Sequence, residues 1–225
     1  MCFSPEASFT GGVIIFSIGV ATVKSVHKPN QLIFAIIPLF FGIQQITEGF
    51  LWLSLQNPEF PNIQKLTSTI FLIMAEILWP MVIPLSVLLM EENKSKKRIL
   101  KVFLVIGILL SSYYAYCLLN FTVNPQIINY HIQYNNDFPV AFRNIAFAAY
   151  LTSTITPLFV SSIKRMHYLG VLMFLSCLIS AMFFKQYLTS VWCFFAAFIS
   201  VAIFWILKDS KKTFNFELVN LLKNK

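Results

Sequence analysis

The sequence predicts an all-α integral membrane protein, a polytopic bundle of seven transmembrane helices without a soluble domain. Of its 225 residues, 57% are hydrophobic and 12% are charged, whereas soluble domains carry roughly 25% charged residues. The mean hydropathy is +0.72, and the apolar residues fall into long runs separated by short polar segments. This composition excludes soluble, disordered, collagen-like and disulfide-rich classes of protein.

A helix needs about 20 predominantly apolar residues to cross a bilayer core of about 30 Å. Ser4 and Pro5 suit the N-cap and the first turn of the first helix. Only Lys185 and Gln186 separate the last two apolar runs. The seven predicted spans lie near residues 8–25, 32–55, 66–90, 99–119, 139–162, 167–184 and 186–207.

The basic residues predict the orientation, because lysine and arginine concentrate in the cytoplasmic loops of membrane proteins. With the N-terminus outside, only Lys65, Arg143 and Lys185 lie on the outer side. The other 14 of the 17 basic residues then lie inside: Lys24, Lys28, Lys94, Lys96, Lys97, Arg98, Lys101, Lys164, Arg165, Lys208, Lys211, Lys212, Lys223 and Lys225. An even number of spans would spoil this alternation, so the charges favour seven spans and a cytoplasmic C-terminus.

Two polar segments lie outside the predicted spans. Residues 208–225 mix lysines with apolar residues, which is typical of an amphipathic helix on anionic lipids of the inner leaflet; a partly ordered basic tail is the alternative. In the outer loop 120–138, the alternating run from Ile127 to Tyr134 favours a short strand over the mouth of the bundle.

Charged residues inside spans are costly and are candidates for function. Glu48 shares one helix face with Gln44, Gln45 and Trp52, since these residues are three or four positions apart. We place Glu48 about 9 Å below the outer end of its span, from the rise of 1.5 Å per residue. These residues predict a polar patch in the outer part of the membrane.

Glu76 is the second glutamate inside a span, and the sequence around it predicts a kink. Pro80 has no amide hydrogen to donate to the carbonyl of Glu76, so free carbonyls are expected beside this glutamate. Its depth is about 14 Å, and Arg143 lies about 6 Å down the fifth span. We therefore expect both glutamates to face one outward-facing pocket, with Arg143 near them.

Tryptophans complete the predicted pocket: Trp192 lies at a depth that matches Arg143, and Trp52 and Trp79 are expected to ring the pocket with it. The ligand-binding candidates are Glu48, Gln44, Gln45, Glu76, Trp79, Trp192 and Arg143. Three interpretations stay open. The pocket binds or transports a small molecule or ion; Glu48 and Glu76 are the acid–base pair of an enzyme that acts on lipid; or the polar residues only hold helices together.

Several chemistries are excluded by the sequence. His27, His131 and His167 fall in or beside loops without metal-ligand spacing, and the four cysteines form no C-x-x-C motif. No lysine lies in the last span to bind retinal, and no nucleotide or hydrolase motif is present. The lysines and arginines punctuate apolar runs rather than forming a nucleic-acid surface. No metal, cofactor or nucleic acid is therefore expected.

Four sequence blocks occur together: Met1-Cys2-Phe3-Ser4, Phe41-Gly42-Ile43-Gln44-Gln45 with Glu48 and Trp52, Trp79-Pro80, and the run from Ser190 to Ala197. As a set they resemble a domain-of-unknown-function family of small, mostly bacterial multi-spanning membrane proteins. The resemblance covers nearly the whole chain and implies a single domain in a bacterial plasma membrane. It implies no reaction. It points to Cys2, Gln44, Gln45, Glu48, Trp52, Trp79, Pro80, Trp192 and Cys193.

Overall fold

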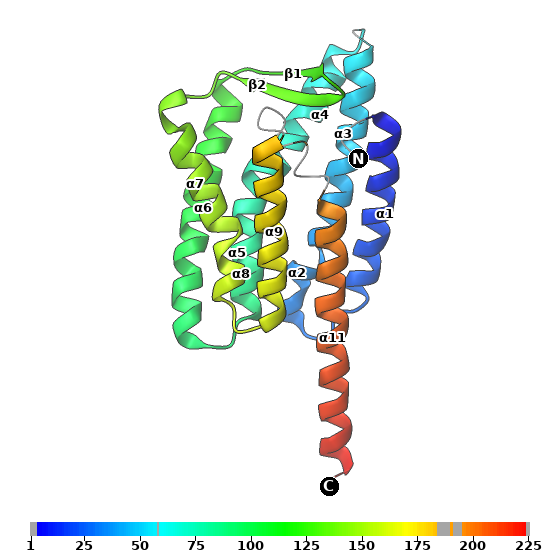
Figure 1. Cartoon of the computed structure of the whole chain (residues 1–225), viewed down its shortest axis with the longest axis vertical. Helices are drawn as coiled ribbons and strands as arrows, with labels where there is room; N and C mark the ends of the chain where they lie inside the picture. The colour runs from blue at the N-terminus through cyan, green and yellow to red at the C-terminus, as the bar shows by residue number, and fades with distance from the viewer. Residues whose placement is uncertain (1–3, 58, 184–189, 191–194, 224–225) are drawn as a thin grey trace.

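The computed structural model describes residues 4–57, 59–183, 190 and 195–223, and only the backbone of residues 212–223. These residues form an elongated helical bundle, capped at one end by a β-hairpin (Figure 1). Five helical segments are long and apolar enough to cross a membrane: Pro5–Val23, Pro29–Gln56, Pro61–Met90, Lys94–Asn120 and Lys164–Phe183. The chain is therefore a helical protein of membrane character.

The first helices pack closely through glycine. Helix α1 (Pro5–Val23) begins as predicted, because the Oγ of Ser4 accepts the amide N–H of Ala7 at 3.2 Å. It lies along α3 (Ile37–Gln56), which follows the short segments η1 (Pro29–Gln31) and α2 (Leu32–Ala35). A Cβ atom at Gly42 would come within 2.8 Å of the backbone nitrogen of Phe16. Small residues let membrane helices approach at this distance.

The next segment runs through α4 (Pro61–Leu72), a π-helical turn η2 (Ile73–Leu78) and α5 (Trp79–Met90). Where a kink was predicted before Pro80, the structure has a π-helical turn. The carbonyls of Ala75 and Ile77 in this turn accept side-chain hydroxyls. The hydroxyls of Tyr150 and Ser111 each donate to one of them at 2.7 Å. Hydrogen bonds from neighbouring helices therefore stabilise the irregular backbone, as the lipid interior requires.

Helix α6 (Lys94–Asn120) begins at the N-cap Asn93 and packs on α5. At their crossing, a Cβ atom on Gly107 would lie 1.8 Å from the carbonyl oxygen of Pro80. Only glycine allows this approach. The segment after α6 then forms an antiparallel hairpin of β1 (Val123–Ile128) and β2 (His131–Asn136). The prediction of one strand from Ile127 to Tyr134 was wrong, because Asn129 and Tyr130 adopt positive φ angles of 49° and 61° and turn the chain.

The remaining helices return across the bundle. After the turn η3 (Val140–Phe142), helix α7 (Arg143–Thr154) is followed by α8 (Thr156–Val160), with Pro157 in its first turn. Neither segment is long enough to count among the five candidate spans. The hydroxyls of Thr152, Ser153 and Thr154 donate to carbonyls of their own helix.

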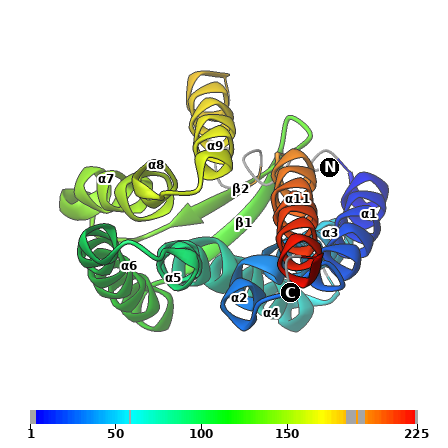
Figure 2. The same ribbon diagram turned by 90° about the horizontal axis from the view of Figure 1, so that it is seen from below.

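Helix α9 (Lys164–Phe183) packs on α8 and α11, and α11 (Ala196–Lys223) also lies beside α1 and α3 (Figure 2). Helix α11 continues without a break past Lys208 and projects beyond the bundle (Figure 1). Only the first 12 residues of α11 precede Lys208, and the charged residues that follow interrupt the apolar run. This helix is therefore not among the candidate spans. The segment 208–223 is thus a continuation of this helix, and not a separate helix or a loose tail.

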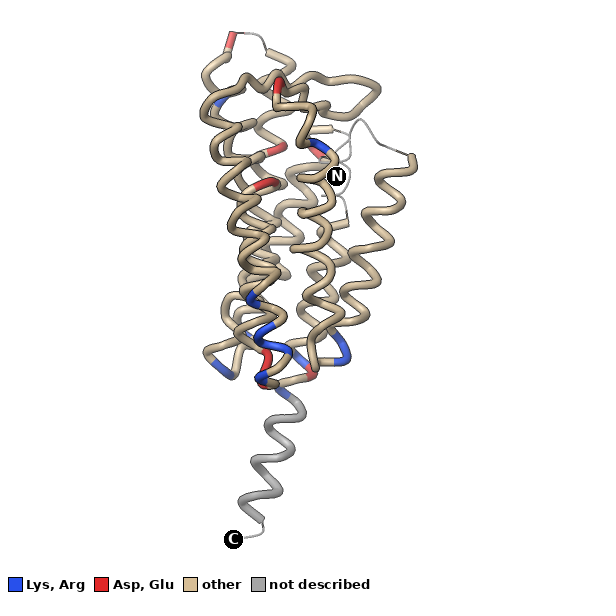
Figure 3. The backbone as a smooth tube through the Cα atoms, turned by 90° about the vertical axis from the view of Figure 1, so that its left-hand side faces the viewer, with Lys and Arg blue, Asp and Glu red and all other residues tan. Residues whose placement is uncertain are grey.

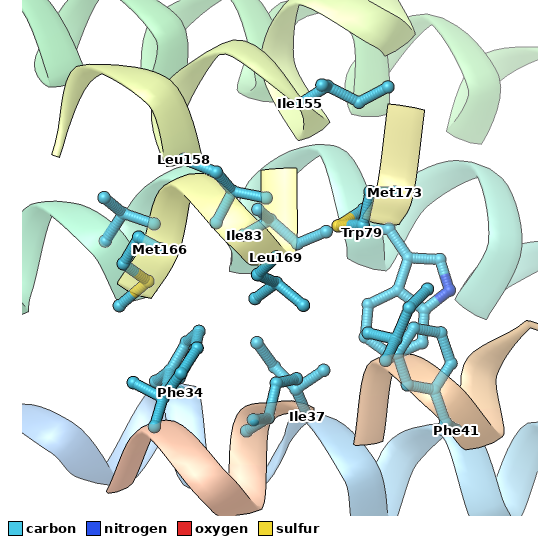
Figure 4. Packing of buried hydrophobic residues seen from close by; sticks show 14 of the residues in the cluster. Phe34, Ile37, Phe41, Trp79, Ile83, Ile155, Leu158, Met166, Leu169 and Met173 are labelled. Atoms are coloured by element: carbon cyan, nitrogen blue, oxygen red, sulfur yellow. The ribbon is translucent and has the colours of Figure 1, made fainter. Parts of the chain in front are cut away.

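The core lies toward the end of the bundle from which α11 projects. Side chains of α2, α3, α5, α8 and α9 meet there, together with Ile155 between α7 and α8. Those labelled in Figure 4 are Phe34, Ile37, Phe41, Trp79, Ile83, Ile155, Leu158, Met166, Leu169 and Met173. Lysines and arginines concentrate around the same end, whereas the hairpin covers the opposite end (Figure 3). The bundle therefore has a basic end and a hairpin end.

Candidate functional site

A buried carboxyl group lies inside the bundle on α3. Glu48 is 0% exposed. It lies eight positions before Gln56, the last residue of the helix, which corresponds to about 12 Å of rise. Its Oε1 accepts the hydroxyl of Ser190 at 2.6 Å, and its Oε2 accepts the Nε2–H of Gln45 at 3.3 Å. Both carboxyl oxygens are thus held by side chains.

The face of α3 that carries Glu48 is the face predicted from the helical period. Gln44, Gln45, Glu48 and Trp52 are all buried, because this side of the helix points into the bundle. The side-chain oxygen of Gln45 is buried and has no hydrogen-bond partner among the described residues. Buried polar atoms are nearly always hydrogen-bonded, so such an atom needs an explanation.

A hydrogen bond joins α3 to α5 one turn before Glu48. The indole Nε1–H of Trp79 donates to the Oε1 of Gln44 at 3.0 Å. The Trp79 ring also packs against Phe41, with ring centroids 4.2 Å apart. Trp79 is therefore fixed by one polar and one apolar contact, and it closes the site on the core side.

The hairpin packs on the part of α3 that follows Glu48. Ile132 of β2 is completely buried and packs against Leu51 and Trp52 of α3. Tyr134 stacks on Phe71 of α4, with ring centroids 4.9 Å apart and an interplanar angle of 4°. The indole nitrogen of Trp52 has no partner within the described part of the chain. The hairpin is thus anchored on the helices that surround Glu48.

Glu76 does not join Glu48. It lies in η2, where its carboxyl is close enough to Tyr113, Tyr114 and Cys117 of α6 to interact with them electrostatically. Its Oε2 is buried and has no hydrogen-bond partner in the described structure. The two glutamates therefore have separate surroundings, with Glu48 bonded to Gln45 and Ser190 and Glu76 beside α6.

The structure does not bring Arg143 to either glutamate. Arg143 begins α7 near the hairpin end and is exposed. Among the described residues it forms no ion pair. The expected proximity failed because the residue falls in the first turn of its helix, where its long side chain reaches the surface. Trp192 and Cys193 lie outside the described residues, as does Cys2.

Sequence reasoning missed two polar residues, one in the Glu48 site and one at the opposite end of the bundle. Ser190 was noted only as part of a sequence block. A single serine forms no sequence pattern, so nothing predicted its hydrogen bond to a glutamate 142 positions away. Glu91, at the basic end, is 1% exposed and accepts three backbone N–H groups. Its position directly after a predicted span was the only signal.

Metal binding finds no support in the described residues, where no three of the His, Cys, Asp and Glu side chains form a group able to hold a metal ion. The site offers carboxyl, amide and hydroxyl oxygens with an indole N–H beside them. Such a set can bind a proton, a small cation or a ligand that donates hydrogen bonds.

Comparison of the sequence with family models gives a match over residues 1–216 to a family described as "Family of unknown function (DUF6629)". The chain belongs to this family. The match confirms the resemblance to an uncharacterised family and extends from the N-terminus into α11, so it includes Glu48, Ser190 and the hairpin. A search of curated proteins and a search of solved structures gave no match.

Proposed function

We propose that this DUF6629 protein binds a small ligand or ion at Glu48, as a transporter or sensor in the membrane. The observation that carries the proposal is the buried Oε1 of Gln45, which has no partner in the described structure although Gln45 itself bonds to Glu48. Two carboxyl oxygens and a spare amide oxygen at one place favour a proton, a small cation or the donor group of a ligand.

The same proposal includes the topology. We infer seven spans, with the N-terminus outside and the C-terminus in the cytoplasm of a bacterial cell. The gathering of basic residues at the end from which α11 projects supports this orientation (Figure 3). The site then lies in the outer part of the membrane beneath the hairpin. Reporter fusions after residues 28, 95, 165 and 225 should read cytoplasmic, and a fusion after residue 130 should not.

The remaining residues of the proposed site have graded roles. The polar groups come from Gln44, Gln45 and Glu48, and Trp79 holds Gln44 by a hydrogen bond. Trp192 lies outside the described residues and stays a predicted member of the site. Glu76 and Arg143 were candidates for the same pocket, but Glu76 lies beside α6 and Arg143 is exposed. An acid–base pair of Glu48 and Glu76 is therefore less well supported than a binding site centred on Glu48.

Thermal unfolding of the purified protein in detergent tests the binding site. Sodium, potassium and ammonium ions and a panel of small amines should be added singly, because a ligand that binds the folded state raises its stability. Wild type should be stabilised by at least one of these probes. Glu48→Gln should lose that stabilisation, whereas Glu59→Gln, which removes an exposed glutamate, should retain it. Equal stabilisation of Glu48→Gln by the same probe would remove Glu48 from the site.

A further inference from the structure

A second polar site lies at the opposite end of the molecule. A cavity of about 260 Å³ opens there between four segments: the region around η1, the end of α5, the loop between α8 and α9, and α11 at Ser210. Its lining includes Lys28, Asn30, Glu91 and Glu92. These residues are unrelated to the Glu48 site, so the inference does not depend on the proposed function.

One wall of the cavity is a rigid carboxylate clamp. The Oε2 of Glu91 accepts the amide N–H of Ser162 at 2.6 Å, and its Oε1 accepts the N–H groups of Glu92 and Asn93 at 3.1 and 2.9 Å. Burial by itself would raise the pKa of Glu91, but these hydrogen bonds outweigh it and hold the pKa below its usual range. Glu91 is thus an ionised, fully engaged group that shapes the cavity.

A second wall is a neutral hydrogen-bond cluster. The Oε1 of Gln31 accepts the backbone N–H groups of His27 and Lys28, and its Nε2 lies 3.3 Å from both Ser210 Oγ and His27 Nε2. Burial lowers the pKa of His27, and the nearby Lys28 and Lys211 lower it further. His27 is therefore neutral near pH 7, which leaves Lys28 as the positive charge that lines the cavity.

The mouth of the cavity presents both signs of charge. The Nζ of Lys28 lies 3.8 Å from the Oε1 of Glu92, and the two side chains are 45% and 83% exposed. An ion pair at this exposure contributes little, so a ligand can replace it without a large cost. The mouth can therefore receive a negative group at Lys28 and a positive group at Glu92.

Asn30 supplies a hydrogen-bond acceptor in the lining of the cavity. Asn30 donates its Nδ2–H to the carbonyl of Leu89 at 3.2 Å, while its Oδ1 is buried and lacks a partner in the described part of the chain. A ligand with an N–H or O–H group beside its negative charge would satisfy this oxygen.

The cavity lies at the level of the lipid headgroups. Met90 and Gln31, which line it, are at or near the ends of the candidate spans Pro61–Met90 and Pro29–Gln56. Lysines and arginines surround this end of the bundle (Figure 3), and such residues attract lipid phosphates.

We propose that this cavity binds a phosphate ester that carries a primary amine, with the phosphate at Lys28 and the ammonium group between Asn30 Oδ1 and Glu92. Phosphoethanolamine is the simplest group with this chemistry. It occurs as the headgroup of a phospholipid and as a free soluble ester. A quaternary ammonium headgroup has no N–H to donate to Asn30, so phosphocholine lipids should bind less well.

The test is thermal unfolding of the full chain in detergent with added dioleoyl phosphatidylethanolamine, phosphatidylglycerol or phosphatidylcholine, and separately with soluble O-phosphoethanolamine. The ethanolamine lipid should give the largest rise in melting temperature. A similar rise with the soluble ester would support the proposed chemistry and identify a soluble source, whereas a rise with the lipid alone would support it and identify the bilayer. Equal rises with all three lipids would overturn the proposal.

Variants separate the two charges of the ligand. Lys28→Gln and Asn30→Leu should each weaken binding, because each removes a hydrogen bond to a charged group. We expect the half-saturating concentration of the ethanolamine lipid to rise about ten-fold in each variant. Lys24→Gln removes the same charge from an exposed position that does not line the cavity, so it is the matched control. The comparison uses the lipid-induced shift within each variant, which a general loss of stability does not imitate. If Lys24→Gln had an effect as large as that of Lys28→Gln, general surface charge would explain the binding, and the proposal would be overturned.

Discussion

Glu48 and Glu91 are both almost completely buried, yet the protein surrounds them differently. Glu91 lies at the end of α5 and accepts three backbone N–H groups, which fix a turn and the loop between α8 and α9. Glu48 lies within α3 and accepts hydrogen bonds from the side chains of Gln45 and Ser190. Backbone donors cannot rotate away, whereas amide and hydroxyl side chains can.

This difference separates a structural carboxyl from one suited to binding. Removing Glu91 would leave three partly buried backbone N–H groups without this acceptor, and each lost hydrogen bond lowers stability. Removing Glu48 would leave side chains that can choose other rotamers or partners. An exchangeable set of partners beside the spare oxygen of Gln45 is what a site that binds and releases a ligand requires.

The largest effect is expected from Glu91→Ala. Three backbone N–H groups lose their acceptor, so the free energy of unfolding should fall by about 3 kcal/mol. Chemical unfolding in mixed micelles measures this free energy of unfolding. Glu92→Ala removes the exposed neighbouring glutamate and should change the same quantity by about 0.5 kcal/mol or less. Similar losses in both variants would show that the clamp is unimportant.

A smaller effect is expected from acid, again through Glu91. The pKa of Glu91 is below its ordinary value, so the folded protein holds this proton less tightly than the unfolded chain. The stability that results is present above the ordinary glutamate pKa of about 4.3 and is lost as the pH falls below it. Unfolding measured across this range should show a steeper acid loss in wild type than in Glu91→Gln. Parallel curves would contradict the assignment.

The smallest effect on stability is expected at Glu48. Side-chain hydrogen bonds between membrane helices contribute about 0.6 kcal/mol each, so Glu48→Leu should cost about 1 kcal/mol and Glu48→Gln less. Thermal melts of both variants beside Glu91→Ala give the ranking directly. A loss in Glu48→Leu as large as that in Glu91→Ala would make Glu48 a structural residue and remove the contrast between the two sites.

Local rules predicted some parts of the site correctly. The spacing of Gln44, Gln45, Glu48 and Trp52 predicted one buried face, because the helical period alone determines which residues of α3 point the same way. The N-cap at Ser4 and the backbone irregularity before Pro80 were predictable for the same reason. Each depends on residues within about one turn.

Long-range partners were not predictable in this way. Glu76 was expected to face Glu48, but it lies in a π-helical turn and its carboxyl interacts electrostatically with Tyr114 of α6. Arg143 was placed in the membrane from its position in an apolar run, yet the helix begins with it and leaves it exposed. Neither outcome could be inferred from the residues next to it in the sequence.

The sequence alone determined the membrane character, the apolar helices and the polar face of α3, since hydropathy and helical period are properties of short segments. The tertiary structure decided that Ser190 and Gln45 hold Glu48, that the hairpin packs on Leu51 and Trp52 of the same helix, and that Glu91 joins the α5 turn to the loop before α9. These contacts depend on how the helices rotate and cross. That geometry is fixed by packing between segments distant in the chain, such as Gly107 against Pro80, and no local pattern records it.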